Sequence, residues 1–353
     1  MSSHPFFSVV IPVFNRPREI QRALKSCLEQ EYAGFEIVVV DDGSTDDTQA
    51  AIRQWADERV TIVSHSGNRG VCAARNTGVR NARGEWMVFL DSDDELLPGA
   101  LDRMAQRIRE TSSTVPRLFF CYAYPDGGQS AAPLVEEVLD YVRYLSLAEQ
   151  VTRADFLNCV RRSSFQVVKW PESRAYEWIY HLNFARAFPT RMFRDVVSRV
   201  HYDAANRLTN VSFFDYLRKQ KVEALDGANA LDEIVASHGV ALRRFAPRIF
   251  RSLLRQRFEM YFLAGETFHG LRLAREFLRA YPLAATAWAT LAAGVLGPSP
   301  LGALKFLRVK SLAHASTPPE NRAIEAGSDC VGQTPWSARA PLDPQMPGKA
   351  RIS

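Results

Sequence analysis

The sequence has few cysteines, and their spacing fits neither a disulfide framework nor a zinc site. Five cysteines are scattered through 353 residues without a CxxC pair: Cys27, Cys72, Cys121, Cys159 and Cys330. Secreted domains usually carry an even set of cysteines, whereas an odd, scattered set is typical of a reducing compartment. We therefore expect a cytoplasmic protein whose cysteines are unpaired.

Long hydrophobic runs are also missing. The longest apolar stretch, residues 283–297, falls short of the ~18–20 residues that cross a bilayer. The N-terminus has no basic segment ahead of its first apolar run, which a signal peptide would have. We therefore expect no transmembrane helix and no secretion signal.

The charge balance is basic, with a formal net charge of +5. Such a balance suits nucleic acid, an anionic lipid surface or a phosphorylated substrate. No nucleic-acid recognition motif accompanies the charge, so nucleic acid is the least favoured of the three. The length suggests roughly two domains of ~100–200 residues each.

The first third of the chain alternates between strand and helix patterns. Apolar runs at residues 7–12, 36–40, 60–63 and 86–90 predict strands. Helical spacing of apolar residues predicts helices at 18–31, 44–56, 70–82 and 99–110, and Ser44 with Asp47 resembles a capping box for the second. This alternation predicts a mainly parallel α/β sheet with helices on both faces, which binds ligands at the carboxyl ends of its strands.

The pattern changes along the rest of the chain. Residues 118–123 are strand-like, 125–128 predict a turn, and 175–188 predict a helix rich in aromatic residues. Beyond residue 211 nearly everything predicts helix, whereas the segment after 316 is rich in Pro, Gly, Ser and Ala. We expect a catalytic α/β domain at 1–215, a helical domain at 216–315 and a disordered tail at 316–353.

Asp91-Ser92-Asp93 follows the strand at 86–90. Two carboxylates two residues apart point the same way in an extended segment. Hard divalent cations prefer such oxygen ligands and bridge them to phosphates, where a metal neutralises the charge of a departing diphosphate. Taken alone the motif is common, and acidic residues at a strand end also cap helices or simply face solvent.

Two more polar clusters lie at the same predicted edge. Asp41 and Asp42 follow the strand at 36–40 and fit either a tight turn with a helix cap or a carboxylate that binds a nucleobase imide N–H. Arg75, near the start of the helix at 70–82, suits either phosphate or a surface ion pair.

In order and spacing these clusters resemble family 2 glycosyltransferases of the GT-A fold. The matching segments span residues 8–98 and read SVVIPVFNRPREIQRALKSCLEQEY, FEIVVVDDGSTDDT and NRGVCAARNTGVRNARGEWMVFLDSDDELLP. The resemblance implies inverting transfer of a sugar from a nucleoside diphosphate sugar, most often UDP-linked, to an acceptor hydroxyl. It also implies Mg²⁺ or Mn²⁺ as cofactor, and glycan or lipid-linked acceptors of the cell envelope.

The resemblance also implies roles for individual residues. Asp91 and Asp93 match the metal motif, with Asp93 the expected direct ligand, and either Asp41 or Asp42 would read the base. Arg75 matches the arginine near the base and diphosphate. The donor site as a whole comprises Pro12, Val13, Phe14, Asp41, Asp42, Arg75, Asp91 and Ser92.

An inverting enzyme needs a general base for the acceptor proton. In the family this is an acidic residue before an aromatic helix, and Glu177 fits that place best, although the usual ED or DD pair is absent here. Asp155, Asp195 and Asp203 remain rivals, and Glu177 could simply be a carboxylate stabilised by a helix dipole. His181, one turn later, is expected to be a packed or solvated histidine rather than a metal ligand.

The segment 242–258 interleaves six arginines with apolar residues. As one amphipathic helix it would either pack on the catalytic domain or lie on an anionic membrane surface. Two other functions stay open. A sugar-nucleotide nucleotidyltransferase would need a Gly-rich basic loop after the first strand, which is missing, and a binding-only relative should lack the acidic residues that are present at 91–94.

Overall fold

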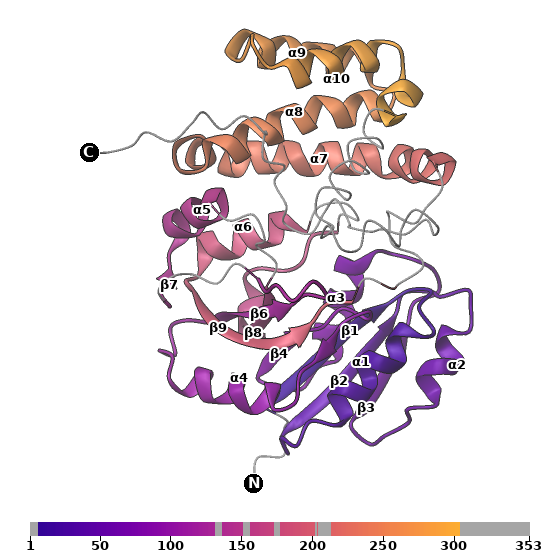
Figure 1. Ribbon diagram of the computed structural model, residues 1–353, viewed down its shortest axis with the longest axis vertical. Helices are drawn as coiled ribbons and strands as arrows, with labels where there is room; N and C mark the ends of the chain where they lie inside the picture. Colours follow the sequence, from indigo (N-terminus) through magenta and orange to yellow (C-terminus); the bar gives the residue numbers. More distant parts are fainter. Residues whose placement is uncertain are drawn as a thin grey trace.

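The computed structural model describes residues 6–130, 136–150, 156–172, 177–201, 203 and 213–303. Figure 1 shows a sheet flanked by helices and, at the other end of the molecule, a stack of long helices. Among these residues the sheet has the strand order β3-β2-β1-β4-β8-β6-β9-β5, with β7 paired to β9. The strands are β1 (Phe7–Val13), β2 (Phe35–Asp41), β3 (Val60–Ser64), β4 (Trp86–Phe89), β5 (Glu95–Leu96), β6 (Arg117–Ala123), β7 (Val138–Leu139), β8 (Leu157–Arg161) and β9 (Thr190–Arg199).

Strands β3, β2, β1 and β4 run parallel. β1 and β2 are buried along their whole length, as expected of strands covered on both faces. Successive β1 residues face opposite layers: Val9 and Ile11 pack with helices α1 (Glu19–Leu28) and α4 (Ala100–Arg109), and Val10 packs with α3 (Val71–Asn81). The predicted α/β architecture with helices on both faces is confirmed.

The sheet is mixed rather than mainly parallel. β8 enters between β4 and β6 and runs antiparallel to both, while β6 and β9 pair in parallel across register shifts. Short β5 and β7 are antiparallel to β9. The parallel prediction fails here because it rested on the strand–helix alternation of the first 110 residues, which does not continue.

One predicted cap is wrong. Helix α2 is short, Thr48–Arg53, and its N-cap side chain at Asp47 makes no capping hydrogen bond. The Ser44 hydroxyl instead accepts the Asn15 N–H at 2.9 Å. The Thr48 N–H is bound by Asp46 at 3.0 Å, so Ser44 joins the end of β1 to the end of β2 rather than starting the helix.

The helical region consists of α7 (Phe213–Phe245), α8 (Pro247–Leu263), α9 (Thr267–Ala280) and α10 (Ala285–Val295). A single helix over 242–258 is therefore wrong. Pro247 lacks a backbone N–H and disfavours helical geometry at the residue before it, and Ala246 has φ −142° and ψ 61°. Helix α7 begins at Phe213, three residues before the predicted domain boundary. Residues 304–353, and with them the predicted tail, lie outside the described part.

The helical region shares a core with the sheet domain. Leu145 of α5 (Tyr141–Gln150) and Ile179 and Leu182 of α6 (Trp178–Ala187) belong to the same buried cluster as Leu231 of α7. Helices α5 and α6 therefore hold α7 against the sheet domain (Figure 1). No helix in the described ranges is both long and apolar enough to cross a membrane.

Candidate active site

The ends of β1, β2 and β4 lie together because β1 pairs with both neighbours in register, Val13 opposite Asp41 and Val10 opposite Phe89. Of the three predicted wall residues, Pro12 and Val13 are buried within β1, and Phe14 is half-buried just past it. Asn15 follows with a left-handed φ of 51°. The chain thus turns sharply at the sheet edge where the donor is expected.

Asp41 and Asp42 are both buried and both hydrogen-bonded within the protein. Asp41 accepts the Ser44 N–H at 3.0 Å and the Gln49 amide at 2.7 Å. Asp42 accepts the backbone N–H groups of Arg69 at 2.9 Å and Gly70 at 2.7 Å. Asp41 therefore stabilises the turn after β2, and Asp42 holds the segment that leads into α3 through hydrogen bonds.

The Asp91-Ser92-Asp93 segment is a turn, not an extended strand end. The Asp94 N–H donates to the Asp91 carbonyl at 3.0 Å, so the two carboxylates do not share one direction. Asp91 pairs with Arg75 at 2.9 Å, whereas Asp93 pairs with Arg16 at 2.7 Å. The prediction that the two carboxylates point the same way is therefore wrong, because the backbone hydrogen bond from Asp94 to Asp91 turns the chain between them.

Arg75 connects three parts of the site. Its guanidinium donates to Asp91 at 2.9 Å and to Glu177 at 2.5 Å, and it lies 4.6 Å from the centre of the Trp170 ring. Helix α3 can place it there because Gly78, one turn later, lies against Val10 so closely that a Cβ would come within 2.3 Å of the valine side chain. Arg75 and Glu177 were predicted separately from the sequence, and the fold brings them together.

The two carboxylates beside Arg75 raise its pKa. Burial lowers the pKa of Arg75, but Glu177 and Asp91 more than offset it, so its pKa lies above the ordinary arginine value. The Arg75 side chain is only 8% exposed, against 32% for Glu177 and 47% for Asp91. A permanently charged guanidinium is thus buried between two acids that solvent can reach.

Sequence reasoning missed two arginines. Arg16 donates to Asp93 and, at 3.3 Å, to the Ser92 hydroxyl. Arg22 donates to the Asp93 carbonyl at 2.8 Å and pairs with Asp203. Arg16 comes directly after the polar end of β1, and this position could have identified it as a site residue. Nothing in the sequence around Arg22 indicates such a role.

A divalent cation fits part of this donor set. Asp91 is half-exposed, and its second oxygen has no hydrogen-bond partner in the described ranges. Asp93 is 9% exposed and paired with Arg16. No cluster of three or more His, Cys, Asp or Glu side chains occurs in the part of the chain that the structure describes. The residues therefore fit a hard cation that takes most of its ligands from phosphate oxygens and water, as Mg²⁺ commonly does.

The rival acids differ in their surroundings. Asp195 pairs with Arg107 of α4 at 2.8 Å, and Asp155 lies outside the described residues. Hydrogen bonds from Arg22 lower the pKa of Asp203 to about 2, which makes it a weak base. Among the described candidates, Glu177 alone contacts Arg75. His181 is packed against Trp170 with its pKa held well below the usual value by burial, as expected.

The fold and the site define an α/β protein of the GT-A type. Residues 8–168 match the model of glycosyl transferase family 2. The matched region includes Arg75 and the acids at 91–94 but ends before Glu177.

Relatives agree with this assignment. An uncharacterized glycosyltransferase of Haemophilus influenzae is 27% identical over 181 residues, 51% of this chain and 71% of the relative. A GalNAc(5)-diNAcBac-PP-undecaprenol beta-1,3-glucosyltransferase of Campylobacter jejuni is 38% identical over 109 residues, 30% of this chain and 35% of the relative. The chain thus spans only about a third of the Campylobacter relative.

One solved structure shares the fold. S. aureus TarS 1–349 in complex with UDP-GlcNAc superposes with a TM-score of 0.50 at 18% sequence identity, over 78% of this chain and 91% of that one. At this level of identity the likeness concerns the fold alone.

Proposed function

We propose that this chain transfers a sugar from a nucleoside diphosphate sugar, UDP-linked in the first instance, to an acceptor hydroxyl with inversion at the anomeric carbon. The observation that carries the proposal is the contact of one buried guanidinium, Arg75, with a carboxylate after β4 and a carboxylate at the start of α6. From this position Arg75 would contact the donor diphosphate and, through Glu177, help to orient the acceptor.

In this proposal Arg75, with Arg16, faces the diphosphate of the donor, and Asp91 and Asp93 hold Mg²⁺ or Mn²⁺, which would supply charge neutralisation for the leaving diphosphate. Phe14 lies beside the base, which either Asp41 or Asp42 reads. These roles agree with the buried positive charge of Arg75 and the accessible oxygen of Asp91.

Glu177 is the proposed general base. Its Oε2 accepts a hydrogen bond from Arg75, and its Oε1 accepts none from the described residues. The acceptor oxygen forms a bond to the anomeric carbon while its proton passes to Oε1, and the bond to the diphosphate breaks with its electron pair on the phosphate oxygen. Arg75 fixes the orientation of Glu177 during this step.

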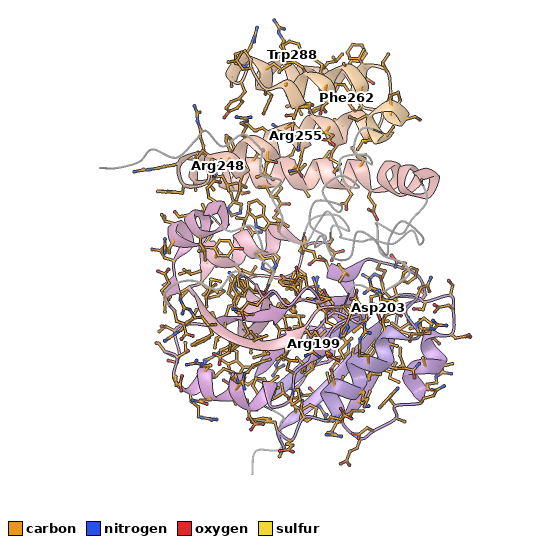
Figure 2. All side chains as sticks on the ribbon, viewed as in Figure 1. Arg199, Asp203, Arg248, Arg255, Phe262 and Trp288 are labelled. Atoms are coloured by element: carbon orange, nitrogen blue, oxygen red, sulfur yellow. The ribbon has the colours of Figure 1, made fainter. Side chains whose placement is uncertain are left out.

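The chemical setting of the acceptor is also proposed. The Campylobacter relative is named for an undecaprenol-linked glycan, and we infer synthesis of a cell-envelope polysaccharide or glycolipid here. Membrane contact at the α7–α8 junction would rest on the exposed Arg243, Arg244 and Arg248. Arg255 and Arg257 are paired with Glu259 and Asp232 instead. Figure 2 shows Arg248 near the start of α8 and Arg255 further along the helix.

The test is a transfer assay with a panel of UDP- and GDP-sugars and mixed glycan acceptors, followed by proton NMR of the new anomeric signal. A product whose anomeric configuration is opposite to that of the donor supports the proposal. A retained configuration would refute inversion. Release of diphosphate from a sugar phosphate and a nucleoside triphosphate would indicate the nucleotidyltransferase alternative.

A further inference from the structure

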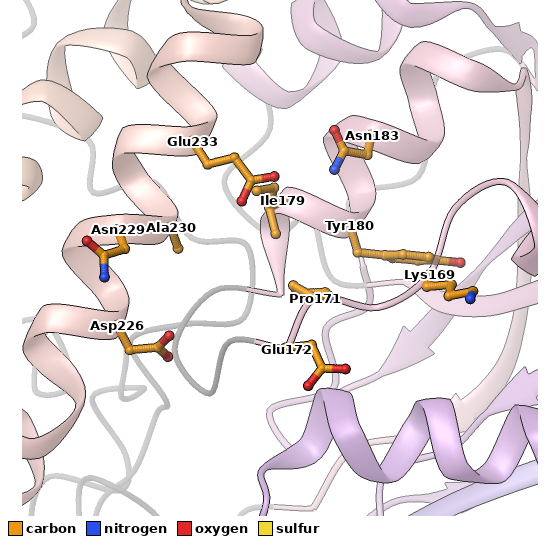
Figure 3. A pocket seen from close by; sticks show the side chains of 10 residues that line it. All are labelled: Lys169, Pro171, Glu172, Ile179, Tyr180, Asn183, Asp226, Asn229, Ala230 and Glu233. Carbon is orange, nitrogen blue, oxygen red and sulfur yellow. The ribbon is translucent and has the colours of Figure 1, made fainter.

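A pocket of about 420 Å³ lies where the helical region meets the sheet domain. Figure 3 shows three segments around it: the chain between β8 and α6, helix α6 itself, and helix α7. This volume is in the range of small-molecule sites, roughly 300–1,000 Å³. Helix α7 lies beyond the family match at 8–168, so this pocket is not part of the matched domain alone.

The lining is polar and acidic. Its polar side chains are Lys169, Glu172, Asn183, Asp226, Asn229 and Glu233. Three carboxylates face one ammonium, in a chain whose net charge is +5. Four of these side chains make no hydrogen bond or ion pair with any described residue: Lys169, Glu172, Asn229 and Glu233. Their polar groups are therefore available to a ligand.

The polar and acidic lining favours some kinds of acceptor over others. Amide and carboxylate groups pair well with hydroxyl groups, whereas a lipid chain needs a mainly apolar lining, and most of the side chains that line this pocket are polar. An anionic unit such as a phosphate or a uronate would meet like charge. The lining therefore fits a neutral or positively charged sugar.

The pocket adjoins the candidate base. Ile179 and Tyr180 line it and follow Glu177 by two and three residues on α6. The Tyr180 ring stacks on Trp170 at 3.8 Å, and Arg75 lies over that same Trp170. The Tyr180 hydroxyl is buried and has no hydrogen-bond partner among the described residues.

We propose that this pocket binds the acceptor, and that the acceptor unit held there is a neutral or amino sugar rather than an anionic one. The inference rests on the proposed glycosyl transfer, because it makes α7 of the helical region part of the acceptor site. Glu177, which immediately precedes α6, would then accept the proton of the acceptor hydroxyl while that oxygen attacks the anomeric carbon from the face opposite the diphosphate.

Two substitutions test the pocket by ligand-observed NMR with methyl hexosides, methyl 2-amino-2-deoxyhexosides and methyl hexuronides. Asn229→Trp fills the space from an exposed position on α7, and Val240→Trp places the same side chain on α7 at a site that is 90% exposed. We expect Asn229→Trp to weaken binding of the neutral and amino sugars by about tenfold or more. Val240→Trp should bind them as wild type does.

Charge is tested by Glu233→Lys, with Glu276→Lys on α9 as a control of equal charge change. Glu233→Lys should lower the preference for the amino sugar over the uronide by roughly tenfold, and Glu276→Lys should leave it unchanged. Saccharide binding that is absent from wild type, equal in wild type and Asn229→Trp, or stronger for the uronide would overturn the proposal. Titration of UDP reports on the donor site separately, so failure of the proposed function is distinguishable from failure of the pocket.

Discussion

Replacing Arg75 by lysine should uncouple the two acids that it joins. A guanidinium reaches Asp91 and Glu177 at once, at 2.9 and 2.5 Å, whereas a lysine ammonium lacks this fork and can hold only one of them. The position is buried, so the substituted lysine would keep the charge but lose one charge-assisted hydrogen bond and the contact with Trp170.

The size of the effect follows from the exposure of the partners. A hydrogen bond to a charged group contributes ~1.5–3 kcal/mol, and the 32% and 47% exposure of the two carboxylates reduces this through solvent screening. We expect a stability loss of about 1–2 kcal/mol, or ~2–6 °C in Tm. Turnover should fall by about 10², because Glu177 would no longer be held in place.

The assay combines a thermal melt with steady-state transfer, and Arg80→Lys on the same helix serves as the control. Arg80 is exposed, and among the described residues its side chain hydrogen-bonds to Thr77 alone, so that variant should remain within ~0.5 kcal/mol of wild type. If Arg75→Lys melts and turns over as Arg80→Lys does, the bridging role of Arg75 is wrong.

Three further predictions concern single groups. Glu177→Gln should lower turnover by ~10²–10⁴ with donor affinity nearly unchanged, and near-normal turnover would remove it as the base; Asp195→Asn is the control. Burial lowers the pKa of His238 to about 4. The folded state therefore binds fewer protons than the unfolded state between pH 6.5 and 4. The free energy of unfolding should decrease by up to ~3 kcal/mol as the pH is lowered through this window. A His238→Gln variant that loses stability just as steeply on acidification would contradict this. Binding to anionic vesicles through the exposed arginines near α8 should weaken with salt, and equal partitioning onto neutral vesicles would count against it.

The parallel half of the fold was readable from sequence because apolar runs and helical spacing alternate there without interruption. The mixed half was not, because β8 and β9 are placed by pairing with distant strands, which local patterns do not encode. The break at Ala246 was a missed local signal, since Pro247 marks it in the sequence.

The candidate site was predicted as separate residues, and its geometry was not. Arg75, Asp91 and Glu177 were each chosen from sequence, but their contact depends on how α6 packs against the sheet, and α6 begins more than a hundred residues after Arg75. The turn that separates Asp91 from Asp93 depends on one backbone hydrogen bond. The pairing of Arg16 with Asp93 likewise joins segments 77 residues apart.

The central claim is that a nucleoside diphosphate binds at the Asp91–Asp93 edge together with a divalent cation. Calorimetric titration of UDP into wild type and Asp93→Ala, each with Mn²⁺ and with EDTA, tests it most directly. We expect tight binding for wild type with Mn²⁺, at least about tenfold weaker binding with EDTA, and an Asp93→Ala variant that stays folded and does not respond to the metal. Equal UDP affinity for wild type and Asp93→Ala in the presence of Mn²⁺ would contradict the account.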